Sequence, residues 1–274
     1  MSFRFKRPGG LAIVTTMVLV FLFAPIVVVL LNAFNGNQTL DSWGGFTGRW
    51  FSEAFHDSSV RSALWVSVRV ALASTALSLI IAIPAALWAR RAGPRARALL
   101  DATTYMRIVL PEIVAAAGLF LLFRRLNMQL GMTAIIAGHV VFTSAYATIV
   151  IQARVATLSG SLEEAAADLG AVPWRAFYRV TLPLLRPAII VAGLLVFTFS
   201  MDDVVTSAFL SGDTVTLPVL IFGLMRFRIT PEVNAIAAGV TVLTLVTFSL
   251  SAALLGWRAG ANLIVGGRTA EEAE

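Results

Sequence analysis

The sequence reads Ser161-Leu-Glu-Glu-Ala-Ala-Ala-Asp-Leu-Gly170-Ala-Val-Pro-Trp-Arg-Ala-Phe-Tyr-Arg-Val180-Thr-Leu-Pro183 where a polar stretch interrupts a chain that is otherwise almost wholly apolar. The stretch predicts two short helices. Ser161 and Glu164 have the spacing of a capping box, in which the hydroxyl and the carboxylate each accept a backbone N–H of the first turn. Gly170 can adopt the left-handed conformation that ends a helix. The first helix is therefore expected to begin at Ser161 and end at Gly170.

The second helix of the stretch is expected to begin at Pro173, because proline suits the first helical position. Trp174, Phe177 and Tyr178 then share one face at i, i+3 and i+4. Leu182-Pro183 is expected to end the helix. A compact aromatic face suits the groove of a partner protein. The alternative is an amphipathic hairpin at the membrane surface whose glutamate only caps a helix.

Composition places the chain in a membrane. Of its 274 residues, 58% are hydrophobic and only 13% are charged, which is too little polar surface for a soluble globule. The net charge of +6 does not indicate nucleic-acid binding, because the basic residues stand at the ends of apolar runs. Cysteine is absent, and His56 and His139 are too far apart for a local metal motif, so no metal site is expected.

Catalytic motifs are absent from the sequence. The single lysine, Lys6, is followed by arginine, so a phosphate-binding G-x-x-x-x-G-K-[ST] loop cannot occur. The H-E-x-x-H and G-x-S-x-G patterns are also missing. We therefore expect no catalytic residue and no cofactor in this chain. A membrane-embedded enzyme is the least favoured function class.

The hydropathy pattern predicts an all-α integral membrane protein with six transmembrane helices. The apolar runs are each about long enough to cross a bilayer core, and they cover residues 11–33, 62–88, 108–123, 133–151, 187–210 and 233–257. Residues 1–274 are expected to form one transmembrane domain. Residues 156–183 form a loop between the fourth and fifth helices, and residues 259–274 form a tail that is expected to be disordered.

The distribution of arginine and lysine predicts the orientation. With the N-terminus in the cytoplasm, basic residues near cytoplasmic segments outnumber those outside by about two to one. Six spans return the C-terminus to the same side. The loop of residues 156–183 then lies in the cytoplasm.

This loop resembles the signature loop of permease subunits of binding-protein-dependent ABC importers. The matching residues are Glu164-Ala165-Ala166, Gly170 and Val180-Thr181-Leu182-Pro183, with valine at the one conservative departure. The resemblance implies a coupling helix that seats in a groove of a separate cytoplasmic ATPase. The residues expected to take part in this coupling are Glu164, Ala165, Ala166, Gly170, Trp174, Phe177, Tyr178, Leu182 and Pro183.

The same resemblance implies partners and a location. ATP is bound and hydrolysed by an ATPase subunit dimer, and an extracytoplasmic solute-binding protein captures the ligand. A second permease subunit, expected to be a different chain, completes the pathway. The chain is expected in the lipid bilayer of a prokaryotic cytoplasmic (inner) membrane. The alternative from another class is a channel or ion-coupled secondary transporter, for which the loop would have no role.

Acidic residues at membrane depth predict a transport path, because burying a charge there is costly. Asp202 and Asp203 lie in the fifth span, and adjacent helical residues point about 100° apart, so the two carboxylates are expected to face different surfaces. Glu112 and Glu232 are further candidates for the path. Each follows a proline at the start of a helix, so each also fits a structural role at the helix dipole.

Three segments extend the resemblance to spermidine/putrescine importer permeases of the second permease type. They are Pro111-Glu112, the segment 199–209 around Asp202-Asp203, and the segment 230–235 around Glu232. The resemblance implies a cationic polyamine as substrate, moved by alternating access. Arg69 departs from the pattern, since it lies inside the second span. A pair between Arg69 and an aspartate would leave room for an amino-acid-like substrate.

Overall fold

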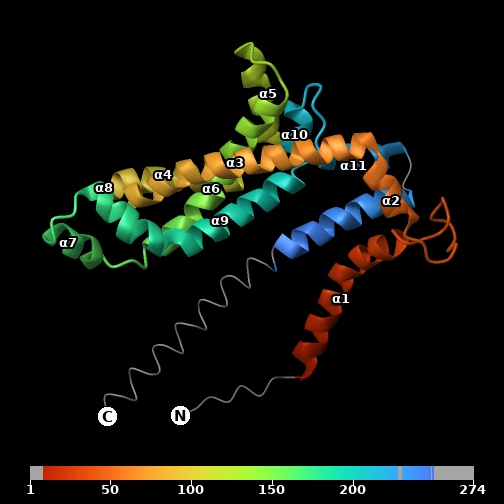
Figure 1. The fold of residues 1–274 in the computed structure, drawn as a ribbon, viewed down its shortest axis with the longest axis horizontal. Helices are drawn as coiled ribbons and strands as arrows, with labels where there is room; N and C mark the ends of the chain where they lie inside the picture. Colours follow the sequence, from red (N-terminus) through yellow and green to blue (C-terminus); the bar gives the residue numbers. More distant parts are fainter. Residues whose placement is uncertain (1–8, 228–229, 248, 250–274) are drawn as a thin grey trace. The chain divides into compact units, whose positions relative to one another are not determined.

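The computed structural model describes residues 9–227, 230–247 and 249 of the chain, and all regular elements in these ranges are helical (Figure 1). The all-α prediction is therefore confirmed for the described residues. Two compact units can be distinguished. Of the described residues, the first comprises 9–61, 221–227 and 230–243, and the second comprises 62–220, 244–247 and 249.

The first unit contains α1 (Gly9–Asn32), α2 (Arg49–His56) and most of the helix Pro231–Thr247. Its core is formed by Ala33, Trp50 and two alanines of the last helix. The indole Nε1 of Trp50 donates a hydrogen bond of 2.6 Å to the carbonyl of Asn35. This bond satisfies the one polar atom of a ring that is otherwise packed in apolar surroundings.

The second unit holds the remaining elements in the order in which the chain forms them. They are α3 (Ser58–Arg91), α4 (Pro94–Val109), α5 (Glu112–Arg125), α6 (Met132–Val155), α7 (Ser161–Asp168), α8 (Pro173–Ala176), the π-helical turn η1 (Phe177–Thr181), α9 (Leu182–Asp202), α10 (Val205–Leu210) and the beginning of α11 (Leu217–Phe227). Helices α6 and α9 lie side by side, and α7 and α8 lie at one end of this pair (Figure 1).

Small side chains let the helices of the second unit approach closely. The core between α3, α6 and α9 is built from Ala82, Ala86, Ala147, Ile151, Val155, Leu185, Ala192 and Val196. Ser78 of α3 and Thr143 of α6 share a buried hydrogen bond of 2.8 Å. Small residues and hydroxyl pairs are typical of helix contacts in membranes, where no hydrophobic effect drives helices together.

Large apolar side chains are exposed in both units, such as Phe21 in the first, 79% exposed, and Leu121 in the second, 65% exposed. Lipid is the medium that accommodates such a surface. In the described residues, four helices are long and apolar enough to span a membrane, and the bent pair α4 and α5 can form a fifth span. The chain is a multi-pass membrane protein. The count of six spans stays a prediction, since part of the run 233–257 lies outside the described residues, as does the predicted tail.

Two predicted spans are broken, which corrects the sequence analysis. The third span does not run straight over 108–123, because α4 already begins at Pro94 and is bent by 105° against α5 at Leu110-Pro111. Polar residues of α4, such as Thr103 and Thr104, lowered its hydropathy and concealed it. The fifth span, predicted over 187–210, is interrupted at Asp203, where the backbone is extended with φ −70° and ψ 110°.

The polar loop differs from the prediction in two details. Ser161 is not a capping residue, because it is the first residue of α7, and its backbone N–H donates a hydrogen bond to Oγ of Ser159. Leu182-Pro183 does not end the second helix, since the chain continues as one helical stretch from Pro173 to Asp202. The N–H of Leu182 bonds the carbonyl five residues back, at Phe177. This wider π turn makes room for the proline ring, which would clash in a regular α-helix.

Candidate functional site

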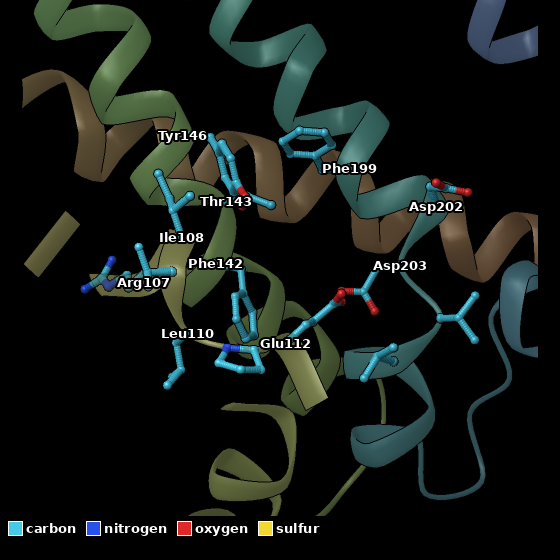
Figure 2. Close-up of a pocket in the computed structure, with 14 residues that line it drawn as sticks. Arg107, Ile108, Leu110, Glu112, Phe142, Thr143, Tyr146, Phe199, Asp202 and Asp203 are labelled. Atoms are coloured by element: carbon cyan, nitrogen blue, oxygen red, sulfur yellow. The ribbon is translucent and has the colours of Figure 1, made fainter. Parts of the chain in front are cut away.

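A cavity of about 620 Å³ lies where the two broken spans meet (Figure 2). The break between α4 and α5 contributes Leu110, Pro111 and Glu112, and the break between α9 and α10 contributes Asp203 and its neighbours. The complete lining consists of Arg107, Ile108, Val109, Leu110, Pro111, Glu112, Phe142, Thr143, Tyr146, Phe199, Asp202, Asp203, Val204 and Val205. Irregular backbone at membrane depth is tolerated where it lines a cavity, and ligand sites of transporters are often built this way.

Two carboxyl groups come together at the edge of this cavity. Glu112 is the first residue of α5, and Asp203 stands between α9 and α10. Their side chains point toward one another (Figure 2). Two like charges in so confined a place repel, and a cation bound between them would relieve the repulsion. Both residues were predicted to line the path, but no pattern in the sequence places them together.

Asp203 also has a structural role. Its Oδ1 accepts the backbone N–H of Ser207 at 3.0 Å, which caps the first turn of α10. Its Oδ2 lies 3.7 Å from Nε2 of His139. One carboxylate therefore holds the broken helix end in place and lines the cavity at the same time.

His139, which the sequence analysis set aside, is the buried residue that joins three helices at the break. It lies on α6 and is 1% exposed. Its Nδ1 is 2.7 Å from Oγ of Ser200 on α9, and its Nε2 is 3.1 Å from Oγ of Ser207 on α10. The imidazole thus fixes the relative position of α9 and α10. A lone histidine in an apolar span gave no pattern from which this role could be predicted.

Asp202 and Arg69 occupy different places from Asp203. Asp202 is the last residue of α9, is exposed, and points away from the pair of facing carboxylates (Figure 2). Arg69 is also exposed, and its guanidinium lies 4.8 Å from the ring centre of Trp65, a cation–π contact within α3. The possible pair between Arg69 and an aspartate is not formed among the described residues.

Aromatic side chains form one wall of the cavity. Tyr146 and Phe199 contact each other edge to face with ring centres 4.8 Å apart, and Phe142 lies nearby (Figure 2). Arg107 lines another part of the cavity and donates a hydrogen bond of 2.9 Å to Oγ of Ser144. Three acidic residues and one arginine line the cavity, which gives the lining a formal charge of −2.

Glu232 belongs to the first unit and is described only within it. It is the second residue of the helix Pro231–Thr247. The hydroxyl of Thr230 accepts the N–H of Val233 at 3.4 Å, as an N-cap residue does. The geometry here fits the structural alternative that the sequence also offered, and a role of Glu232 in the path stays a prediction.

The polar loop forms a compact hairpin of helices. Gly170 has φ +78°, and the N–H groups of Gly170 and Ala171 bond the carbonyls of Ala167 and Ala166 at 2.8 and 3.0 Å. This pattern is a Schellman motif, as expected for a glycine that ends a helix. Trp174, on α8, is 68% exposed.

The aromatic residues of the hairpin form one cluster. The ring centre of Trp174 lies 4.4 Å from that of Tyr178 and 6.2 Å from that of Phe177. Leu182 and Pro183 are half-buried at the start of α9. The exposed part of the cluster is therefore carried by the tryptophan and the tyrosine.

The two adjacent glutamates of the hairpin differ in exposure, since Glu164 is exposed and Glu163 is partly buried. Glu164 and Ala165 are exposed, and Ala166 is half-buried. Glu163, which the sequence analysis did not single out, is bonded by Thr181 at 2.9 Å and by Arg91 at 2.8 Å. Burial alone raises the pKa of Glu163, but these hydrogen bonds and the nearby arginines outweigh it and lower the pKa below its usual value. The ion pair of Glu163 therefore stabilises the folded chain at neutral pH. This contribution disappears as the pH falls through the lowered pKa and the carboxylate is protonated.

Comparison with known proteins gives the family. Residues 78–258 match the model of the binding-protein-dependent transport system inner membrane component. The chain belongs to this family. It is a permease subunit, and the ATPase of such systems is a separate subunit.

Relatives of this family come from several bacteria. The chain is 36% identical over 225 residues to the putrescine transport system permease protein PotI of Escherichia coli, an alignment that covers 79% of this chain and 80% of the relative. It is 34% identical over 236 residues to the spermidine/putrescine transport system permease protein PotC of Haemophilus influenzae, covering 86% and 92% of the two chains.

Solved structures show the same fold at lower sequence identity. A bacterial ABC transporter that imports the acidic polysaccharide alginate matches with a TM-score of 0.70 at 17% identity, covering 91% of this chain and 97% of that one. An alginate ABC transporter in complex with its periplasmic protein matches with a TM-score of 0.65 at 18% identity, covering 89% and 91%. The chain thus has the permease fold of ABC importers.

Proposed function

We propose that this permease carries a polyamine of the putrescine or spermidine type. The observation that carries the proposal is the pair of facing carboxylates, Glu112 and Asp203, in one cavity at two helix breaks. The relatives at 36% and 34% identity are named as putrescine and spermidine/putrescine permeases. One line of support is geometric and the other comes from the comparison of sequences.

The chemistry of the cavity suits an aliphatic ammonium ion. Carboxylates attract the ammonium group, and the faces of Tyr146 and Phe199 offer both cation–π contact and apolar surface for methylene groups. The formal charge of −2 on the lining favours a dication over a zwitterion. A weak, partly hydrated site is what transport requires, since a substrate that is bound too firmly does not leave.

The polar hairpin supplies the connection to ATP hydrolysis in this proposal. Helix α7 and the aromatic cluster of α8 and η1 dock on a cytoplasmic ATPase dimer, and both termini of the chain are cytoplasmic. An extracytoplasmic binding protein delivers the substrate, and a second permease chain provides the other wall of the path. Closure of the ATPase moves the hairpin and thereby switches the cavity between the two sides of the membrane.

Uptake of labelled putrescine into proteoliposomes tests the proposal. The permease is reconstituted with its ATPase, second permease and binding protein. Glu112→Gln should lower uptake about tenfold with unchanged complex yield, because the amide keeps the shape and removes the charge. The matched control is Asp213→Asn, which removes a charge from an exposed loop outside the cavity. Parental uptake in Glu112→Gln, or uptake driven by an ion gradient without ATPase, contradicts the proposal.

Arg107 supports a second candidate, a small zwitterion of the amino-acid type. Arg107 is among the residues that line the same cavity as the carboxylates, so both signs of charge occur in its lining. The same assay separates the candidates. Inhibition of putrescine uptake by excess spermidine, and not by amino acids, supports the polyamine. The reverse pattern supports the zwitterion.

A further inference from the structure

The ion pair of Glu163 connects the polar hairpin to the membrane helices. Glu163 lies in the first turn of α7, and its Oε2 is 2.8 Å from Nη2 of Arg91 and 3.6 Å from Nη2 of Arg90. These two arginines are the last residues of α3, a helix of 34 residues. The other oxygen, Oε1, accepts the hydroxyl of Thr181 at 2.9 Å.

Thr181, the third partner of Glu163, lies where the π turn η1 meets α9. Thr181 is the last residue of the π turn η1, is 4% exposed, and directly precedes α9. Glu163 therefore joins α7, the end of α3 and the start of α9 through one side chain. Glu163 itself is only 21% exposed. It borders a cavity of about 340 Å³, and the other residues that line this cavity come from α3, α7, α8, η1 and the loop before α8.

Helix α7 has little else to hold it against the membrane helices. None of its residues is buried. Its α-helical neighbour α8 is likewise without a buried residue. Because α7 buries no side chain, apolar packing contributes little to its attachment, and polar contacts matter more. In the second unit, Glu163 supplies the ion pair and the hydrogen bond that attach α7 to α3 and to the turn before α9.

We propose that Glu163 is a positioning residue that makes the hairpin move together with α3 and α9, so that force from the ATPase reaches the cavity. The inference rests on the proposed role of the hairpin in coupling. Helix α9 ends at Asp202, which lines the cavity of the helix breaks, and α3 packs beside α9. A movement of the hairpin that α9 follows therefore reaches the cavity. Glu164, the neighbouring acid of the signature motif, is exposed and free to contact the ATPase instead.

The test measures substrate transported per ATP hydrolysed in the reconstituted complex. Glu163→Gln should lower this ratio about fivefold, a value reduced for the exposure of Arg91, while ATP hydrolysis persists. Thr181→Val should lower the ratio as well, and Thr181→Ser should restore it because the hydroxyl is kept. The matched control is Asp168→Asn. Asp168 lies on the same helix, but its carboxylate forms no ion pair with any described residue.

A covalent link in place of the ion pair shows whether Glu163 acts by positioning the hairpin or only by stabilising the complex. The chain has no cysteine, so Glu163→Cys combined with Arg91→Cys introduces the only two thiols. In a complex with cysteine-free partners, a short bifunctional thiol reagent should restore coupling that the double variant has lost. A parental ratio in Glu163→Gln, or a lower complex yield with an unchanged ratio, overturns the proposal.

Failure of the inference and failure of the coupling assignment give different results. If Gly170→Val and Trp174→Ala uncouple transport but Glu163→Gln does not, the hairpin is the coupling element and only the role of Glu163 is wrong. If none of the three variants changes the ratio, the coupling assignment itself is wrong.

Discussion

Replacement of Asp203 by asparagine and by alanine separates its two roles. Asparagine removes the charge but keeps an oxygen that can accept the N–H of Ser207, whereas alanine removes both. We expect Asp203→Asn to leave the thermal stability of the complex unchanged. Asp203→Ala should lower the free energy of unfolding by about 1 kcal/mol through the lost cap, and the midpoint of thermal unfolding by about 2–4 °C.

The effect of Asp203 on transport follows from its charge. A unit charge about 4 Å from an ammonium group contributes about 4 kcal/mol in a medium of intermediate polarity. Water in the cavity and the remaining carboxylate of Glu112 reduce the net loss to about 1.5 kcal/mol, which corresponds to about tenfold in apparent affinity. Both variants should therefore show the same loss of putrescine affinity.

Uptake at a series of putrescine concentrations, together with thermal unfolding of the purified complex, is the assay for this series. Parental affinity in Asp203→Asn refutes the role of the charge. Equal unfolding midpoints for the asparagine and alanine variants refute the role of the cap. A loss of affinity in alanine alone would mean that Asp203 acts only through the position of α10.

The remaining predictions concern two glycines and the exposed tryptophan. Gly170→Val should uncouple ATP hydrolysis from uptake, because a valine at φ +78° costs about 1–2 kcal/mol. Trp174→Ala should have the same effect, because it removes exposed contact area. Unchanged substrate-stimulated hydrolysis in both variants contradicts this. Gly138→Ala should lower complex yield, since a Cβ there would lie 2.6 Å from Cδ1 of Leu210 and separate α6 from α10. Parental yield and uptake in that variant would show that the contact can adjust.

The sequence predicted the class of the protein and the position of the polar hairpin for physical reasons. Long apolar runs have no other stable environment than a bilayer. Gly170 and Pro173 are residues whose backbone preferences are strong and local, so the end of α7 and the start of α8 could be placed from sequence. The end expected at Pro183 was wrong, because a π turn lets a helix continue past a proline, and that turn depends on tertiary contacts of Thr181.

The candidate cavity was less predictable. Asp203 and Glu112 were named because acids are rare at membrane depth, but their meeting depends on two helix breaks separated by about ninety residues, which no local pattern encodes. His139 escaped notice because a single buried histidine is compatible with any helix interface. Glu163 escaped notice because its partners, Arg90 and Arg91, are distant in the sequence.

Thiol labelling of the cavity tests the central claim, that the carboxylates at the helix breaks form part of a path for organic cations. Val205→Cys places the only thiol of the chain in the cavity wall, and Ala208→Cys places one outside it on the same short helix. In the assembled complex, we predict that the cysteine at position 205 reacts faster with an ammonium-bearing methanethiosulfonate than with a sulfonate-bearing one, and that putrescine slows the reaction. The cysteine at position 208 should show neither effect. Equal rates with both reagents and no protection by putrescine at position 205 would contradict the account.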